Sequence, residues 1–522
     1  MSNNPTLRAP VPQLQDFLEA SARRLPEKVA LVSGPSRVTY RELDAESNRL
    51  ANGLVKRGVG RGDRVLILAE GTTDTVIAFW AALKANAVAC PVNPFMKGPK
   101  LATLLEDCTP AALLGSSGCA TLLQSAARVR PLPALTVLRG QEGLETVALS
   151  GAARWEDVTS GEPSSGPPVR TNIDIDLAAL IYTSGSTGEP KGIMLTHRNM
   201  ITAAVSINAY LEASEDDVVL DALPLSFDYG LYQVIMASLV GATVVLERSF
   251  AYPAQVLADM AREAVTVFPA VPTMIATLAG MSLSGHDFSR IRTVTNTAAA
   301  IAPAHVDFIR RTFRGARFYS MYGLTECKRC SYLPPGDLDR KPGSVGIAIP
   351  NTELWIVDEQ GNRAGPNVVG ELVVRGATVM KGYWNKPEAT AERLRPGPLP
   401  GELVLHTGDL CRLDEDGYLY FVARMDDVIK TRGEKVAPKE VEAALLDILG
   451  VREAAVVGIP DTILGQAVKA FVVLQADSAL TPAAIRLQCQ ARLEPHMVPT
   501  EIVIVAALPR TGTMKINKRE LL

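Results

Sequence analysis

The sequence predicts an α/β protein with a large N-terminal domain of parallel βαβ sheets, a small β-barrel-like subdomain and a small α+β C-terminal domain. Apolar runs alternate with amphipathic stretches from residue 64 to residue 322, which is typical of βαβ units. From about residue 344 short strands alternate with Gly, Asn and Asp turns. The chain has 522 residues and exceeds the length that one core usually covers, so we expect more than one domain.

The N-terminal part contains strands and helices in alternation. Each predicted strand is a short, mostly apolar run, and each predicted helix has apolar residues at helical spacing. We expect strands at residues 64–68, 177–182, 242–246, 265–268 and 292–295, and helices at residues 73–83, 230–239, 253–261 and 303–312.

The remaining elements predict an antiparallel β subdomain and a compact C-terminal domain. Strands are expected at residues 353–357, 370–375, 402–405 and 418–422, then helices at 438–449 and 482–493 around strands at 454–457 and 470–473. We place the N-terminal domain at residues 1–424, with the subdomain at about 344–424, and the C-terminal domain at residues 425–522. The polar segment from Arg424 to Arg432 is the expected hinge.

Composition narrows the class of protein. A net charge of -3 gives no electrostatic reason to expect nucleic acid or an anionic membrane as partner. The N-terminus lacks the basic start and apolar core of a signal peptide, and no apolar run is long enough to span a bilayer. Seven cysteines without framework spacing favour the reducing cytoplasm. The pair Cys327 and Cys330 lacks the second ligand pair that a zinc site needs.

The stretch Tyr-Thr-Ser-Gly-Ser-Thr-Gly-Glu-Pro-Lys-Gly, residues 182–192, has the composition of a phosphate-binding loop. Gly185 and Gly188 let successive backbone N–H groups turn inward and form a concave anion site. The hydroxyl side chains add donors, and Lys191 adds a positive charge. The ordinary P-loop ends in Gly-Lys-Ser/Thr, whereas Gly192 follows the lysine here, which indicates a different class of nucleotide-binding protein.

Four further polar clusters follow at residues 322–326, 406–409, 424–433 and 508–518. A carboxylate such as Glu326 near a bound triphosphate is the usual anchor for Mg²⁺. Asp409, after a predicted strand, is placed to accept from both ribose hydroxyls. Each cluster alone is equally typical of a helix cap, a turn or a solvated tail, and only their combination favours a function.

In order and sequence these clusters resemble the adenylate-forming superfamily of acyl-CoA synthetases, peptide-synthetase adenylation domains and firefly-type luciferases. The resemblance extends from about residue 15 to residue 522, and the 183–192 loop with Tyr322–Glu326 is its most specific part. It implies that a carboxylate attacks the α-phosphate of ATP, giving acyl-AMP and pyrophosphate. A thiol then displaces AMP and forms a thioester. The C-terminal domain is expected to be mobile and to rotate between these two half-reactions.

The resemblance also implies roles for single residues. The phosphates of ATP would be held by Thr183, Ser184, Gly185, Ser186, Thr187, Gly188 and Lys191. Adenine would lie against Ala298, Ala299, Ala300, Tyr322 and Gly323, and the ribose against Asp409 with Arg424. Thr325 would contact the α-phosphate, Glu326 would hold Mg²⁺, and Lys515 would be the catalytic lysine, with Lys518 as the competing candidate. Asp426 matches the hinge, and Gly433 the loop along the thiol tunnel.

The expected acyl pocket is lined by Phe227, Asp228, Tyr229, Thr297, Met321 and Leu324. In amino-acid adenylation domains a Phe-Asp pair at this position directs its carboxylate to the substrate ammonium, and Asp228 favours that interpretation slightly. The alternative is that Asp228 caps the helix expected from Gly230. Lys328 and Arg329 are candidates for a second substrate carboxylate, although basic residues at such a place are more often exposed.

The favoured function is therefore the activation of an amino acid and its transfer to the phosphopantetheine of a separate carrier protein. The alternative is an acyl-CoA ligase for a non-amino fatty or aryl acid. A luciferase-like oxygenase and a non-catalytic binder of nucleotide are further possibilities. Retention of Lys191, Glu326 and Lys515 argues against the non-catalytic binder.

Overall fold

A computed structural model describes residues 13–140, 151–184, 190–297, 301–431, 434–461, 464–511 and 516–522. The chain divides into two compact units. Unit 1 comprises Met1–Pro335, Ala348–Glu353 and Arg375–Leu405, and unit 2 comprises Gly336–Ile347, Leu354–Val374 and His406–Leu522. The domain boundary expected at residue 424 stays a prediction. No helix in the described part of the chain is both long and apolar enough to cross a membrane.

The first sheet of unit 1 is largely parallel, as the apolar runs predict. Within the described residues its strand order is β19 (Gly382–Tyr383), β9 (Pro190–Thr196), β8 (Leu177–Ser184), β4 (Val88–Val92), β3 (Arg64–Leu68), β5 (Ala112–Ser116), β6 (Leu135–Arg139), β7 (Ala153–Arg154). Strand β9 is antiparallel to both β8 and β19. The central strands are buried on both faces, which explains why their sequences are almost continuously apolar.

The second sheet follows the same principle. Its order is β16 (Ile347–Ala348), β15 (Ser331–Leu333), β14 (Arg317–Tyr322), β13 (Thr293–Asn296), β12 (Val267–Ala270), β10 (Val218–Asp221), β11 (Thr243–Leu246), β1 (Val29–Ser33), β2 (Ser36–Thr39). In this spatial order, the strands from β14 to β1 run parallel to one another. Strand β2 pairs antiparallel with β1, and β15 pairs antiparallel with β14. The prediction of parallel βαβ sheets is therefore confirmed.

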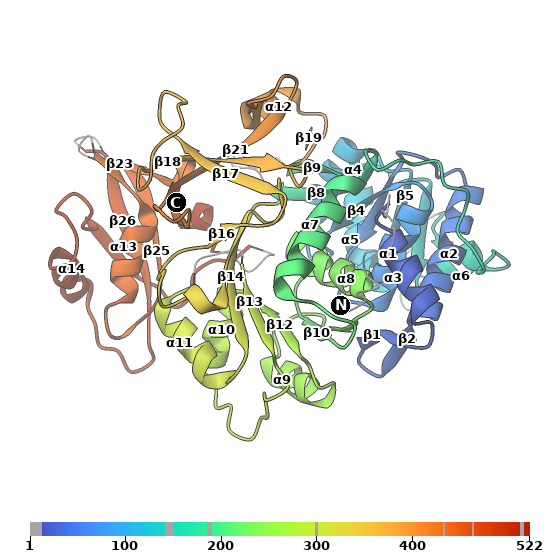
Figure 1. The fold of residues 1–522 in the computed structure, drawn as a ribbon, viewed down its shortest axis with the longest axis horizontal. Coiled ribbons are helices and arrows are strands. Elements are labelled where there is room, and N and C mark those ends of the chain that lie inside the picture. The colour runs from blue at the N-terminus through green and yellow to red at the C-terminus, as the bar shows by residue number, and fades with distance from the viewer. Residues whose placement is uncertain are drawn as a thin grey trace. The chain divides into compact units, whose positions relative to one another are not determined.

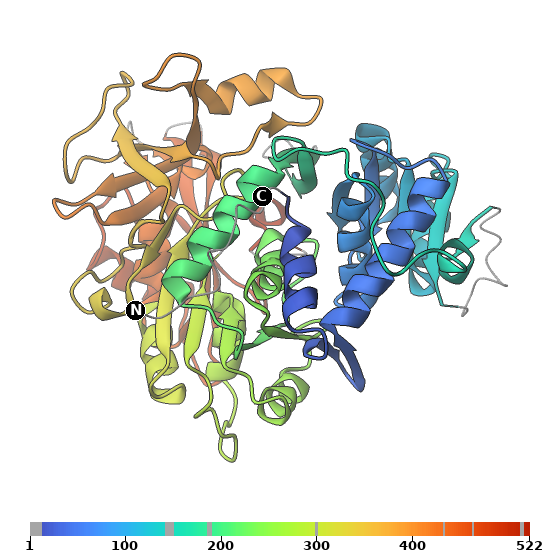
Figure 2. The same ribbon diagram turned by 45° about the vertical axis from the view of Figure 1, so that its right-hand side comes forward.

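Helices connect the strands of both sheets. Those of unit 1 are α1 (Asp16–Arg24), α2 (Tyr40–Lys56), α3 (Thr73–Lys84), α4 (Gly98–Cys108), α5 (Ala120–Ala127), α6 (Trp155–Thr159), α7 (His197–Leu211), α8 (Asp228–Val240), α9 (Pro253–Arg262), α10 (Pro272–Ala279), α11 (Pro303–Thr312) and α12 (Pro387–Arg393). Helix α8 packs against α1, which is dark blue in Figures 1 and 2, and against α7, which is green. This contact buries α8 along nearly all of its length, so its sequence has no polar face.

Unit 2 contains most of a third sheet and all of a fourth. The third has the order β17 (Thr352–Val357), β18 (Gly370–Gly376), β21 (Leu403–Leu413), β20 (Leu394–Pro396), with β22 (Leu419–Arg424) antiparallel to β21. The fourth has the order β24 (Glu434–Val436), β23 (Ile429–Thr431), β26 (Gly465–Leu474), β25 (Val451–Asp461), with β27 (Glu501–Ile504) beside β26. Helices α13 (Pro438–Leu446) and α14 (Pro482–Gln490) contribute Val441 and Ile485 to its core.

A buried lysine joins two helices of unit 1. The side chain of Lys84, at the end of α3, is fully buried. Its ammonium donates to Asp44 Oδ1 at 2.6 Å and to Ser47 Oγ and Asn48 Oδ1, both at 2.7 Å, all on α2. Burial lowers the pKa of Lys84, and the Asp44 carboxylate opposes that shift. The charge is thus retained in the interior by one anion and two neutral acceptors.

We expect Asp44→Ala to destabilise unit 1 by about 3 kcal/mol, because the change leaves a buried ammonium without its counter-ion. The midpoint of urea unfolding, followed by tryptophan fluorescence, measures the effect. Glu46→Ala on the same helix is the matched control, since its ion pair with Arg49 is exposed and is worth less than about 1 kcal/mol. Equal midpoints for the two variants would contradict the interpretation.

Candidate active site

The phosphate-loop segment is a hairpin between two antiparallel strands. Thr183 pairs with Lys191 and Ser184 with Pro190, so the ends of the loop are held in the sheet. Tyr182 donates its hydroxyl hydrogen bond to Asp107 Oδ2 at 2.6 Å, which ties β8 to the end of α4. Strand β9 was not predicted from the sequence. Gly185, Ser186, Thr187 and Gly188 lie outside the described residues.

Lys191 and Glu326 both contact Tyr383, although they are far apart in the sequence. Strand β19 pairs with β9 and sets the Tyr383 ring 5.2 Å from the Lys191 Nζ. The Tyr383 hydroxyl donates to Glu326 Oε1 at 2.9 Å. Sequence reasoning missed Tyr383, and no local signal marks it, because its place depends on the β9–β19 pairing.

The surroundings of Glu326 fit a magnesium ion bound together with a phosphate. Glu326 is half-buried, and Tyr383 occupies only one of its two carboxylate oxygens. No group of three or more potential ligands is found in the described ranges. Mg²⁺ bound with a nucleotide commonly takes one or two carboxylates and completes its shell with water and phosphate oxygens. A single carboxylate is therefore sufficient.

Asp409 and Arg424 form a cross-strand pair within unit 2. The two residues are register partners on β21 and β22, and Arg424 Nε lies 3.1 Å from Asp409 Oδ1. Asp409 is buried, while Arg424 is exposed. The sequence placed Asp409 after a strand, but β21 continues to Leu413, so the carboxylate projects from within the strand. The two side chains are thus paired, and their contact with a ribose stays a prediction.

A tight turn follows β14 and directs two cations inward. Lys328 has a left-handed backbone with φ of 65°, and Cys330 N donates to Tyr322 O at 2.9 Å. The turn brings the Lys328 carbonyl oxygen so close that an added Cβ at Gly323 would lie 2.0 Å from it. Only glycine fits at this position. The turn buries Lys328 and Arg329, which are 2% and 6% exposed, so the expectation of solvated side chains is wrong.

These two cations lie beside the amino end of α8. The Lys328 Nζ is 5.2 Å from the Tyr232 ring, and the Arg329 guanidinium carbon is 4.7 Å from the Tyr229 ring. Burial lowers the pKa of Lys328 to about 8, and the Asp228 carboxylate is the strongest opposing influence. Lys328 thus places a positive charge of the protein itself at this end of α8.

The structure also answers whether Asp228 caps a helix. Helix α8 begins at Asp228, and its N-cap residue, Phe227, has no side-chain capping bond. The start of the helix packs closely on the preceding loop, because an added Cβ at Gly230 would lie 2.6 Å from the Pro224 carbonyl oxygen. Asp228 is 4% exposed and occupies the first helical position. The capping interpretation is wrong, although the negative charge still suits the helix dipole.

The other expected pocket residues are buried or half-buried. Tyr229 exchanges a hydrogen bond with Thr295 Oγ1 at 2.6 Å, and burial raises its pKa to about 12. Met321, on β14, lies with its sulfur 2.9 Å from the Tyr210 hydroxyl. Thr297 and Thr325 are buried, and Leu324 and Phe227 are half-buried. Asp426 is exposed in a short 3₁₀ turn after β22.

The Cys327 and Cys330 thiols lie together beneath the same turn. Their sulfur atoms are 3.1 Å apart, and both residues are fully buried. The contact with Cys330, together with burial, raises the pKa of the Cys327 thiol. These thiols are packed and unreactive in character, as buried cysteines generally are.

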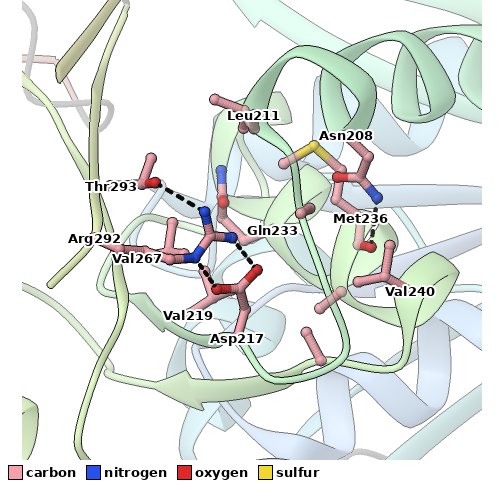
Figure 3. A pocket seen from close by; sticks show the side chains of 13 residues that line it. Asn208, Leu211, Asp217, Val219, Gln233, Met236, Val240, Val267, Arg292 and Thr293 are labelled. Atoms are coloured by element: carbon pink, nitrogen blue, oxygen red, sulfur yellow. Dashed lines mark hydrogen bonds and ion pairs between the residues drawn. The ribbon is translucent and has the colours of Figure 1, made fainter. Parts of the chain in front are cut away.

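A small cavity of about 30 Å³ lies at the other end of α8 (Figure 3). Asn208 and Leu211 of α7, Met236 and Val240 of α8, and the Asp217–Arg292 ion pair line it. Arg292 Nε donates to Asp217 Oδ1 at 2.6 Å, and Asn208 Nδ2 donates to the Met236 carbonyl at 3.0 Å. The space holds only about two waters, and none of the predicted site residues lines it, so it is a packing void.

Several predicted site residues lie outside the described residues. Besides the loop from Gly185 to Gly188, they are Ala298, Ala299, Ala300, Gly433 and Lys515. Lys518, the competing lysine, is described, and its ammonium lies 2.7 Å from Glu442 Oε1.

Comparison with known proteins extends over nearly the whole chain. Residues 18–384 match the AMP-binding enzyme family, and residues 440–515 match the AMP-binding enzyme C-terminal domain. A feruloyl-CoA synthase from Amycolatopsis is 34% identical over 508 residues, which cover 96% of each chain.

Solved structures agree with the sequence relatives. An anthranilate CoA ligase in complex with anthranoyl-AMP has a TM-score of 0.89 and 28% identity, covering 99% of this chain and 98% of its own. ATP-bound MatB from Rhodopseudomonas palustris has a TM-score of 0.85 and 27% identity, covering 97% and 98%. The sequence match, the α/β fold and the residues gathered around Glu326 lead to one conclusion: the chain belongs to the AMP-binding enzymes of the adenylate-forming superfamily, and it is an AMP-forming acid–thiol ligase.

Proposed function

We propose that this enzyme joins a carboxylic acid without an amino group to coenzyme A, using ATP and Mg²⁺ and passing through an acyl-AMP. The similar proteins named above as a feruloyl-CoA synthase and an anthranilate CoA ligase support coenzyme A as the acceptor. They favour the acyl-CoA ligase alternative over the carrier-protein interpretation that the sequence suggested. The ATP-bound and acyl-AMP-bound relatives support the nucleotide chemistry.

The observation that carries the choice of acid is the burial of Lys328 and Arg329 at the amino end of α8, the end at which Asp228 lies. A substrate ammonium would need the Asp228 carboxylate as its counter-ion, but Lys328 already provides a positive charge there. Arg329 adds a second buried cation against Tyr229. An incoming ammonium would meet like charges in a region of low dielectric constant, which is costly. An acid without an amino group avoids that cost.

In the proposed mechanism the protein acts by position and charge. Lys191 and the 183–188 loop hold the phosphates, while Glu326, oriented by Tyr383, holds Mg²⁺ when it is bound. Asp409 accepts from the ribose hydroxyls and is itself oriented by Arg424. Lys515 bridges the substrate carboxylate and the α-phosphate, where charge develops during the attack. Release of pyrophosphate leaves acyl-AMP, from which the thiol of coenzyme A displaces AMP.

A panel of acids tests the proposed function. Purified enzyme is incubated with ATP, Mg²⁺, one acid and either coenzyme A or a phosphopantetheinylated carrier protein, and products are identified by mass spectrometry. We expect acyl-CoA from aryl or aliphatic acids, and no higher yield of thioester from the corresponding amino acids. Thioester formation on the carrier protein alone, from an amino acid, would restore the earlier interpretation.

Lys515→Ala should lower kcat for pyrophosphate release by a factor of about 100 to 1,000, because its charge acts mainly in the transition state. Binding of a non-hydrolysable ATP analogue should change little. Lys518→Ala is the matched control, since that ammonium is already paired with Glu442, and it should retain most activity. If the two variants exchange these phenotypes, Lys518 is the catalytic residue.

Glu326→Gln should raise the Mg²⁺ concentration needed for half-maximal rate, because the change removes an anionic ligand while it preserves an acceptor for the Tyr383 hydroxyl. Excess Mg²⁺ should partly restore activity. Glu388→Gln, on the exposed face of α12, serves as the control for an altered surface carboxylate. An unchanged Mg²⁺ dependence of the Glu326 variant would rule out this role.

A further inference from the structure

The charged cluster at the amino end of α8 contains one more cation than anion. Asp228, Lys328 and Arg329 are each more than nine-tenths buried, so the three side chains together carry a net charge of one positive unit. An interior charge without a counter-ion costs several kcal/mol, and proteins rarely retain one without a reason. The other carboxylate of this turn, that of Glu326, accepts from the Tyr383 hydroxyl instead. In the described part of the chain, the cluster therefore lacks an anion that accepts from Lys328 and Arg329.

Hydrogen bonds within the protein do not supply that anion. Among the described residues no side chain or carbonyl accepts a hydrogen bond from the Lys328 ammonium, and the Arg329 Nε likewise has no acceptor. The Arg329 Nη1 makes only a long contact of 3.4 Å with the Lys328 carbonyl. By contrast, the buried Lys84 has three side-chain acceptors within 2.7 Å. The fold can thus satisfy a buried lysine, and at Lys328 it does not.

The backbone holds Lys328 in this unfavourable place. Its φ of 65° is a left-handed conformation that a long side chain rarely adopts, and the Gly323 contact leaves the turn no room to relax. Strained residues of this kind are concentrated at ligand-binding sites. The flanking residues Tyr229 and Met321 belong to the expected acyl pocket, so the missing anion lies on the side of the site where the acid binds.

We infer that the acid activated by this enzyme carries a second carboxylate, remote from the reacting one, which binds between Lys328 and Arg329. This inference rests on the proposed function and adds the substrate class. The carboxylate would accept from the Lys328 ammonium and the Arg329 Nε. Tyr229 and Tyr232, already stacked on the two cations, would form the apolar sides of the subsite. Asp228 then balances the remaining positive charge.

The test compares matched substrates in the intact enzyme. Each dicarboxylic acid of an aliphatic and an aromatic series is paired with the monocarboxylic acid in which a methyl group replaces the second carboxylate. We expect wild type to convert the best diacid with a kcat/KM at least about 100-fold above that of its methyl analogue, because the analogue leaves one buried positive charge unbalanced.

Lys328→Met retains the length of the side chain and removes its charge. This variant should raise the KM of the diacid by about 100-fold, leave its kcat within a few-fold, and bring the diacid and methyl analogue close to equal kcat/KM. Lys56→Met, at an exposed position on α2, should leave the ratio unchanged. The wild-type ratio alone suffices if the Lys328 variant does not fold.

Three results would overturn the inference. If wild type converts the methyl analogues as well as the diacids, the second-carboxylate subsite is wrong while the coenzyme A ligase function stands. If an amino acid is preferred to both, the buried cations do not select the acid and both proposals fail. Absence of acyl-CoA from every acid tested would likewise reject both.

Discussion

The turn after β14 positions residues of both the proposed magnesium site and the proposed acid pocket. Its closure requires glycine at position 323, because the Lys328 carbonyl occupies the space of a side chain. On one side of the turn Glu326 meets Tyr383, and on the other Lys328 and Arg329 enter the interior beside α8. Since Glu326, Lys328 and Arg329 lie within four residues of one turn, the proposed magnesium ligand and the proposed acid-binding cations share one local backbone.

Electrostatics connects this geometry to the choice of acid. Adenylation brings an anionic carboxylate to an anionic phosphate, so the protein gains rate by placing positive charge where negative charge develops. The same low dielectric that strengthens those contacts makes an unpaired interior charge costly. In the proposed acid pocket, Asp228, Lys328 and Arg329 would therefore select by charge, against an ammonium and for an anion.

Local sequence patterns located most of the regular structure and failed where an element has no pattern of its own. Strand β3 and helix α11 begin and end where their apolar runs predict. Helix α7 and strand β9 are not predicted from the sequence. Strand β9 contains Pro and Gly, which are rare in strands, and its partners are β8 and the distant β19. The third and fourth sheets were recognised because Gly, Asn and Asp turns separate their short strands.

The sequence by itself determined the adenylate-forming chemistry, because the segments expected to hold phosphate, magnesium and ribose are short and their residue types follow from the ligand. It also associated Asp409 with Arg424. Only the tertiary structure decided the environment of Asp228. The buried cations at this end of α8, Lys328 and Arg329, come from a turn a hundred residues later in the chain, in which Lys328 has a left-handed backbone. Burial and pairing of a charge are properties of packed neighbours, and a linear pattern does not contain them.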